Sequence, residues 1–197
     1  MNKITIYEVY RKILHTFSAV IPLSYIWIIK EKNTIVVLLL LLTIFAIIIE
    51  VLRNYSKIIG ILFNRYFSYM LRDKEAYGEI TGATWLLIGF TITVIAFPMP
   101  IAVSALIFLS IGDSFAAIFG KLFPLGMIGN KTLSGTLAGF VSSLGVLLII
   151  NPPLKLNLLL FGAIFAMVIE LIPLKINDNI TIPILSGFIM QIMDTFL

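Results

Sequence analysis

Long uncharged apolar runs constrain the fold of this chain more than any other feature. The clearest run is TIVVLLLLLTIFAIII at residues 34–49, and 60% of the 197 residues are hydrophobic, against about 45–50% in soluble domains. A helix of about 17–25 apolar residues crosses a bilayer. We therefore expect an all-α integral membrane protein, a bundle of about seven transmembrane helices near residues 12–29, 34–52, 81–98, 100–119, 132–150, 156–173 and 179–196.

The segments between the expected helices are short, with one exception. Asn33 and several prolines punctuate the sequence. No long polar segment remains, so we expect residues 1–197 to form a single polytopic domain. Residues 53–80 alternate apolar and basic side chains, which is typical of an amphipathic helix at the membrane interface. A loop helix packed on the bundle would give the same pattern.

Motif and cysteine content exclude several classes of protein. The chain has no cysteine, so disulfides and thiolate metal sites are excluded. HExxH, DxD and GxSxG sequences are absent, so zinc-enzyme and hydrolase interpretations have no support. Glu8 lies in the first segment without a small-residue cleavage site, so we expect no removable signal peptide.

Basic residues are distributed unevenly between the expected loops, which orients the chain. With the N-terminus in the cytoplasm, three of the 14 basic residues lie on the outer side: Lys30, Lys32 and Lys155. The inner side holds the rest: Lys3, Arg11, Lys12, Arg53, Lys57, Arg65, Arg72, Lys74, Lys121, Lys131 and Lys175. The same orientation puts the unusual polar clusters on the cytoplasmic side, so we expect the chemistry there.

Asp113 interrupts the apolar stretch IAVSALIFLSIGDSFAAIFGKLFP at residues 101–124. A carboxylate inside a bilayer costs about 2.5–3.5 kcal/mol on insertion scales, so such a residue usually lines a wet cavity, binds a cation or takes part in chemistry. Asp113, Ala117 and Gly120 fall on one helix face. Asp113 is therefore a candidate catalytic residue and metal ligand.

A glycine-rich loop follows the segment that carries Asp113. Exposed amides beside a helix N-terminus form a ready anion site, and the loop adds lysines and hydroxyls. It is not a Walker loop, because an asparagine precedes its second lysine. Helix packing alone would also explain membrane glycines. The candidates for phosphate binding are Lys121, Gly129, Asn130, Lys131, Thr132, Ser134 and Gly135.

Two further acids are expected near the same face as Asp113. Glu170 lies at the inner end of one expected helix, and Asp178 and Asn179 begin the next. Carboxylate and amide oxygens suit Mg²⁺, which usually takes one or two carboxylates plus substrate phosphates. Glu170 and Asp178 are thus candidate catalytic residues and metal ligands. A helix N-cap would explain the polar residues at 177–179, but it would not explain Glu170.

Polar residues near the first expected helix form another candidate cluster. Arg11 and His15 lie one turn apart and share a helix face. Arg11, Lys12 and His15 either line the same pocket as Asp113 or anchor the helix at the membrane interface.

Two other segments are better explained by structure than by chemistry. Glu50 and Arg53 lie one turn apart, so a structural ion pair is the plain interpretation. The charged run at residues 72–79 is typical of a solvated loop. Thr81 is expected to cap the helix that follows this loop.

In this order the clusters resemble the CTP-dependent lipid kinases: dolichol (polyprenol) kinase, phytol kinase and CTP-dependent diacylglycerol kinase. The resemblance covers nearly the whole chain, and GD…GK with the following K-x-x-x-G is its most specific part. GD…GK also resembles part of the phosphatidate cytidylyltransferases, which use CTP too, but their acidic C-terminal signature is absent. The matching segments are RKILH at 11–15, E-x-x-R at 50–53, E-x(5)-TGAT at 75–84, GDSFAAIFGK at 112–121, GNKTLSGTLAG at 129–139 and E-x-x-P with DN at 170–179.

The resemblance implies transfer of the γ-phosphate of CTP to an isoprenoid alcohol of the dolichol or polyprenol type. Diacylglycerol, phytol and geranylgeraniol are alternative acceptors. It implies Mg²⁺ at Asp113, helped by Glu170 or Asp178, with phosphate oxygens on the loop lysines. Asn130 and Asn179 are candidates for contact with the cytosine.

The same resemblance sets the expected partners. These are CTP, a membrane lipid alcohol and the lipid bilayer, with a homodimer allowed and no nucleic acid expected. A different class of function also fits the spans and the buried acids. In that alternative the protein is a carrier in which Asp113 and Glu170 relay ions or protons, and it would not consume CTP.

Overall fold

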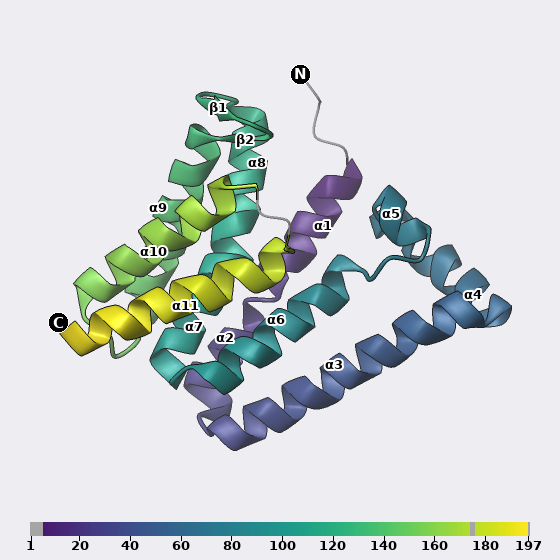
Figure 1. Cartoon of the computed structure of the whole chain (residues 1–197), viewed down its shortest axis with the longest axis horizontal. Coiled ribbons are helices and arrows are strands. Elements are labelled where there is room, and N and C mark those ends of the chain that lie inside the picture. Colours follow the sequence, from purple (N-terminus) through teal and green to yellow (C-terminus); the bar gives the residue numbers. More distant parts are fainter. Residues whose placement is uncertain (1–5, 174–175, 197) are drawn as a thin grey trace.

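The chain is an assembly of helices with one short β-hairpin (Figure 1). This computed structural model describes residues 6–173 and 176–196. Lys3 and Lys175, two of the basic residues used to orient the chain, lie outside the described residues. In chain order the elements are α1 (Ile6–Phe17), α2 (Val20–Ser24), η1 (Tyr25–Ile29), α3 (Lys32–Tyr55), α4 (Lys57–Phe67), η2 (Ser68–Met70), α5 (Asp73–Ala76), α6 (Gly82–Ala96), α7 (Met99–Ile107), η3 (Phe108–Asp113), α8 (Ser114–Leu122), β1 (Met127–Ile128), β2 (Lys131–Thr132), α9 (Leu133–Ile150), α10 (Leu156–Leu171) and α11 (Asp178–Phe196).

Each predicted membrane helix coincides with helical structure, so the all-α prediction is confirmed for the described residues. Within these residues, four helical segments are long and apolar enough to cross a membrane: Ile6–Ile29, Lys32–Tyr55, Met99–Leu122 and Leu133–Ile150. α6 and α10 are apolar but shorter. The structure therefore supports four candidate membrane-spanning helices, and seven crossings stay a prediction.

The helix that carries Asp113 runs through the centre of the molecule. The segment Met99–Leu122 comprises α7, η3 and α8. In its apolar 18-residue stretch 83% of the residues are buried, against 22% in the corresponding stretch of α3. α1, α6, α9, α10 and α11 all contact this central segment. α3 lies at the edge and packs on α6, where Thr43 and Thr91 share a buried hydrogen bond of 2.8 Å. Such hydroxyl pairs are typical of contacts between apolar helices.

Several helix ends are set by local side chains. Thr81 Oγ1 accepts a hydrogen bond from Thr84 N at the start of α6, so the predicted cap is confirmed. Thr132 Oγ1 caps α9 in the same way by accepting from Gly135 N at 3.1 Å. α9 ends where Asn151 adopts a left-handed φ of 50°, next to the proline pair predicted to separate two helices.

The predicted amphipathic segment 53–80 contains α4, the 3₁₀ turn η2 and the short α5. α4 exposes Ile58, Ile61 and Tyr66 among its polar residues. Exposed apolar side chains on a partly basic helix fit a surface that lies against lipid headgroups. Contact with the membrane stays a prediction.

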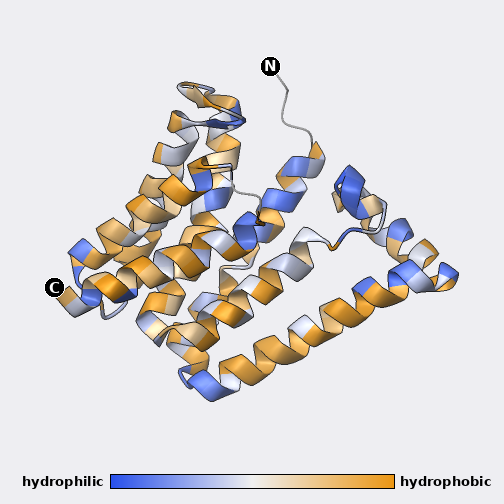
Figure 2. Cartoon of the chain, viewed as in Figure 1, coloured by the Kyte–Doolittle hydropathy of each residue, from blue (hydrophilic) through white to orange (hydrophobic). Residues whose placement is uncertain are grey.

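The polar groups gather toward one end of the molecule. Figure 1 shows the β1–β2 hairpin, the first turns of α1 and the last turns of α8 at this end. Figure 2 shows hydrophilic residues there, whereas the middle of α3 is hydrophobic. The fold thus places the segments with the predicted motifs close to one another.

Candidate functional site

Asp113 closes η3, a π-helical turn that interrupts the central helix. Such a turn holds more residues than an α-helical turn, so it rotates the following side chains relative to the preceding ones, and it occurs frequently at functional sites. Asp113 is only 7% exposed. The π-helical turn explains how a central, buried helix can direct one carboxylate toward α1.

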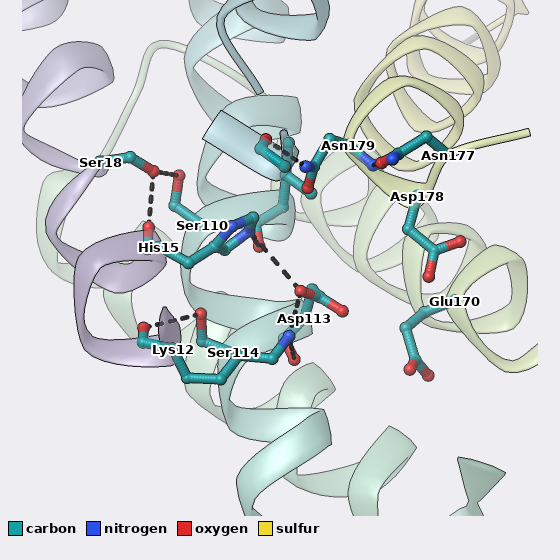
Figure 3. A network of polar contacts seen from close by, with 12 residues as sticks. Lys12, His15, Ser18, Ser110, Asp113, Ser114, Glu170, Asn177, Asp178 and Asn179 are labelled. Atoms are coloured by element: carbon teal, nitrogen blue, oxygen red, sulfur yellow. Dashed lines mark hydrogen bonds and ion pairs between the residues drawn. The ribbon is translucent and has the colours of Figure 1, made fainter. Parts of the chain in front are cut away.

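Two side chains of α1 meet the Asp113 carboxylate (Figure 3). Lys12 Nζ lies 2.6 Å from Asp113 Oδ2, and His15 Nε2 lies 3.6 Å from the same oxygen. His15 Nε2 also lies 3.2 Å from the carbonyl oxygen of Leu109. Because a carbonyl oxygen only accepts, this hydrogen bond requires the ring hydrogen on Nε2. We call Lys12, His15 and Asp113 the Asp113 cluster.

A row of serines fastens α1 to the central helix beside this cluster. Ser18 Oγ donates to the carbonyl oxygen of His15 at 2.6 Å and lies 2.9 Å from Ser110 Oγ. Ser114 Oγ donates to the carbonyl oxygen of Lys12 at 3.4 Å. These serines were not among the residues predicted from the sequence to position the site. Their spacing in an otherwise apolar helix, one turn before and one residue after the aspartate, is the signal that could have found them.

A second cluster joins β2, α10 and α11. Lys131 Nζ lies 2.6 Å from Glu170 Oε1 and 3.2 Å from Asp178 Oδ2. Glu170 is 3% exposed. Burial of Lys131 favours its neutral form, but the Glu170 carboxylate, helped by Asp178, outweighs burial and raises the pKa of Lys131 above its ordinary value. Lys131 is therefore positively charged at neutral pH. We call Lys131, Glu170 and Asp178 the Lys131 cluster.

The two clusters lie side by side. Figure 3 shows Asp113 on the central helix facing Glu170 and Asp178 on α10 and α11. The charge of Asp113 acts on both Lys131 and Glu170. The structure thus brings together the three acids that the sequence placed near one face. Lys12 pairs with Asp113, and Lys131 pairs with Glu170 and Asp178.

The donor set at these clusters suits magnesium, although it is not a ready-made cage. Across residues 6–173 and 176–196, no group of three or more His, Cys, Asp or Glu side chains is close enough to hold a metal. Mg²⁺ usually takes one or two carboxylates and completes its shell with substrate phosphates and water. The carboxylates of Asp113, Glu170 and Asp178 therefore fit a magnesium ion that is bound together with a nucleotide.

The loop between α8 and α9 uses several predicted phosphate ligands for its own fold. Thr132 Oγ1 is the cap of α9 and accepts from Gly135 N. Ser134 Oγ donates to the carbonyl oxygen of Phe123 and accepts from Leu125 N at 3.3 Å. These contacts hold the β1–β2 hairpin, which presents Lys131 to the acids.

Glycines in this region serve two different purposes. A Cβ atom at Gly120 would lie 2.5 Å from Thr132 Oγ1, and one at Gly135 would lie 2.4 Å from Ala116 O. Both glycines therefore allow α8 and α9 to pack closely, as the helix-packing alternative expected. Gly129 differs, because it has a φ of 59° and open space around it. The Gly129-Asn130 turn is exposed, like most of this loop.

The remaining basic residues predicted for the site lie at its edge. Lys121 at the end of α8 forms an ion pair with Glu8 of α1, and both side chains are partly exposed. Arg11 is within electrostatic reach of Glu8, Glu75 and Asp113. A small pocket between α1 and α8 is lined by Arg11, Lys121 and Lys12 among others. Basic groups thus extend from the Asp113 cluster to the surface.

Glu50 and Arg53 form the structural pair predicted from their spacing, with Arg53 Nε 2.8 Å from Glu50 Oε2. Glu50 Oε1 also accepts from Thr81 N at 2.9 Å and from Thr84 Oγ1 at 3.0 Å. This carboxylate therefore fixes the start of α6 against the end of α3.

The start of α6 in turn holds the start of α11. Asn179 Nδ2 donates to the carbonyl oxygen of Gly82 at 2.9 Å, and Glu75 Oε1 accepts from Gly82 N at 3.1 Å. A Cβ atom at Gly89 would lie 2.0 Å from Asn179 O, so α6 and α11 approach closely here. Because Asp178 adjoins Asn179, this network positions one acid of the Lys131 cluster.

Comparison with known proteins finds distant sequence similarity to one class of enzyme. The chain is 28% identical to CTP-dependent diacylglycerol kinase 1 of Saccharomyces cerevisiae, over 98% of this chain and 76% of that enzyme. It is 26% identical to CTP-dependent diacylglycerol kinase 1 of Eremothecium gossypii, over 98% of this chain and 69% of that enzyme. An uncharacterised protein of Rickettsia prowazekii is 28% identical over 90% of each chain.

No family model and no solved structure matches the chain. The distant similarity to the two kinases supports a CTP-dependent lipid kinase, which is the class that the sequence motifs resemble. Together with the four apolar helices it also suggests a membrane protein.

Proposed function

We propose that this protein is a membrane kinase that transfers the γ-phosphate of CTP to the hydroxyl group of a lipid alcohol. The observation that carries the proposal is buried Asp113, paired with Lys12 and adjacent to the Lys131 cluster. It occurs in a chain that resembles CTP-dependent diacylglycerol kinases over nearly its whole length. That similarity favours the kinase over the ion carrier.

The basic groups have the arrangement that a nucleotide triphosphate needs. Phosphoryl transfer depends mainly on positioning and on neutralisation of charge. In the proposed complex Lys12 and Lys131 exchange one carboxylate contact for phosphate oxygens. The exposed amides at Gly129 and Asn130 bind the outer phosphates, and Arg11 and Lys121 supply charge at the rim.

We assign Mg²⁺ to Asp113, with Glu170 or Asp178 as the second carboxylate. A bound magnesium ion would neutralise charge on the β- and γ-phosphate oxygens. The chain's own residues have a separate task, which is to orient the triphosphate and to accept a proton.

In the transfer step the hydroxyl oxygen of the lipid attacks the γ-phosphorus atom of CTP. A new O–P bond forms while the bond to the β–γ bridging oxygen breaks, and CDP leaves with the electron pair. The hydroxyl proton passes to a carboxylate of the site and then to water. The products are the lipid monophosphate, CDP and one proton.

The identity of the acceptor is the finer part of the proposal. The resemblance of the sequence motifs implies an isoprenoid alcohol of the dolichol or polyprenol type. The names of the two CTP-dependent relatives make diacylglycerol an equal candidate. Both are membrane lipids with a single reactive hydroxyl group, so both are compatible with an acid that accepts one proton.

The decisive experiment incubates purified protein with γ-labelled CTP and a panel of lipid alcohols. We expect label in a lipid monophosphate for at least one member among diacylglycerol, polyprenol, phytol and geranylgeraniol. Unlabelled CTP should compete with the label and ATP should compete poorly. Equal use of ATP would defeat the CTP assignment, and no labelled lipid with any alcohol would defeat the kinase proposal.

We propose that the site faces the cytoplasm, where CTP is available. A cysteine at Met127 should then react with an impermeant thiol reagent only from the cytoplasmic side. Met127 is 61% exposed, and the chain has no other cysteine. It is a better reporter than neighbouring Gly126, because a Cβ there would lie 2.8 Å from Leu133 Cδ1 on a backbone with φ of 65°.

Pro153→Cys is the matched reporter for the opposite side. Pro153 is exposed between α9 and α10, on the side that the basic-residue distribution assigns to the exterior. It should react from outside intact cells, and CTP with Mg²⁺ should slow labelling only at Met127→Cys. Labelling of Met127→Cys from outside would reverse the proposed orientation.

A further inference from the structure

We infer that a groove between α1–α2 and α8 binds the hydrocarbon chain of the lipid acceptor, an assignment that rests on the proposed function. The groove has a volume of about 510 Å³, within the range of about 300–1,000 Å³ that is usual for small-molecule sites. Its walls include Ile13, Phe17 and Val20 on one side and Phe115 and Ile118 on the other.

The lining is almost entirely apolar. Thr16 is the one polar side chain among the lining residues. Phe115 also stacks on Phe119 within α8, with ring centroids 6.0 Å apart and planes at 11°. A charged or strongly polar ligand would find no partner for its polar groups here. The chemistry of the walls therefore selects a hydrocarbon chain.

The position of the groove identifies where that chain comes from. Its walls belong to Ile6–Ile29 and Met99–Leu122, two of the candidate membrane-spanning segments among the described residues. Ile13, Phe17 and Val20 are 55%, 69% and 49% exposed, so the groove is bordered by apolar side chains that can face lipid. A chain from the bilayer can enter without crossing water.

The groove also begins where the polar site ends. Lys12 and His15 alternate along α1 with Ile13 and Thr16, so one helix supplies both the acid's partners and a groove wall. On the facing helix Ile118 lines both this groove and the small pocket that contains Lys12 and Lys121. A lipid alcohol with its chain in the groove would therefore present its hydroxyl group to the Asp113 cluster.

The contribution of the groove to acceptor binding should depend on the length of the hydrocarbon chain, and it should not come from the hydrophobic effect. The chain is already in hydrocarbon before it binds, so the gain comes from close packing of its methylene groups. Filling the groove should raise the KM for a long-chain alcohol and leave the turnover of a short-chain alcohol nearly unchanged.

Val20→Trp fills the groove, and Val37→Trp is its matched control. Val37 is 56% exposed on α3, away from the groove, so both variants place the same bulky side chain on an exposed apolar position. With the best acceptor from the labelled-CTP panel, we expect Val20→Trp to raise the KM about tenfold, which corresponds to ~1.4 kcal/mol. Val37→Trp should behave as the wild type.

A second readout does not depend on activity. Hexadecanol that carries a diazirine near its chain end is incorporated in phosphatidylcholine vesicles with the protein and photolysed, beside a methyl-ether analogue without the hydroxyl. We expect hydroxyl-dependent crosslinks in α1, α2 and α8, which Val20→Trp abolishes and Val37→Trp retains. Labelling spread equally over α3, or identical kinetics for the two variants, would overturn the groove assignment.

The two proposals fail in different ways. Localised, hydroxyl-dependent crosslinks without labelled product from any alcohol would overturn the kinase proposal and leave a binding site for lipid alcohols. Labelled product together with crosslinks that ignore the groove would leave the kinase and remove this subsite.

Discussion

The Asp113→Asn variant is expected to lose at least about a hundredfold of its CTP-dependent phosphorylation rate, the usual cost of removing one electrostatic element of a transition state. Asparagine keeps the size of the side chain but removes the negative charge that the proposed Mg²⁺ site and the proposed proton transfer require. Initial rates at saturating CTP, lipid and Mg²⁺ measure the effect. Asp194→Asn, an exposed change near the end of α11, is the control and should keep full activity.

The structure also predicts how this variant affects stability. A buried lone carboxylate could be removed at no cost in stability, but Asp113 is paired with Lys12 at 2.6 Å. Breaking one partner of a buried pair leaves the other charge without compensation, which costs stability. Asp113→Asn should therefore be somewhat less stable than the wild type, while the Asp113→Asn/Lys12→Met double variant recovers.

This double variant separates the structural and chemical contributions of the pair. Thermal unfolding should show recovered stability, and the labelled-CTP assay should show no recovered activity. If Asp113→Asn alone kept near-normal turnover at saturating Mg²⁺, the carboxylate would have neither the metal nor the proton role. If the double variant regained activity, the loss in the single variant would reflect folding.

Local features of the chain could be predicted from its sequence. Apolar runs and their breakers located the helices, because periodicity and capping act over a few residues. The Glu50–Arg53 pair and the Thr81 cap were predictable for the same reason, since each joins residues within one turn. For distant segments the sequence predicted less. Lys12 and Asp113 were expected to share a pocket, but their ion pair was not predicted.

Three features of the site could not be read from the sequence. The π-helical turn at Phe108–Asp113 has no composition that sets it apart from an α-helix. The hydroxyls of Thr132 and Ser134 bond the backbone of their own loop, as such side chains readily do, and their contact with phosphate stays a prediction. The partner of each lysine depends on how distant helices pack.

The number of membrane crossings was also difficult to predict, because it depends on where each helix ends. α6 has 15 residues and α10 has 16, so at 1.5 Å per residue each is about 23 Å long, shorter than the hydrocarbon core of about 30 Å. Caps and prolines end these two helices before the apolar runs of the sequence end. Apolar content alone therefore predicted longer helices than the fold contains.

Lys131→Met is expected to weaken CTP binding about 10- to 150-fold, since a hydrogen bond to a charged group contributes about 1.5–3 kcal/mol. Burial disfavours the charged form of Lys131, but the Glu170 carboxylate outweighs it and raises the pKa of this lysine, so the charge is present at neutral pH. Removing it also leaves Glu170 and Asp178 facing each other without a cation. The KM for CTP should rise while the KM for the lipid acceptor changes little.

Two lysines serve as comparisons for this prediction. Lys57→Met makes the same change on an exposed residue of α4 outside the site, and its KM for CTP should equal that of the wild type. Lys121→Met should have an intermediate effect, because Lys121 lies at the rim and already pairs with Glu8. Since Lys131 alone contacts both acids within the Lys131 cluster, unchanged CTP affinity in Lys131→Met would remove this cluster from the nucleotide site. The kinase proposal would then rest on the Asp113 cluster.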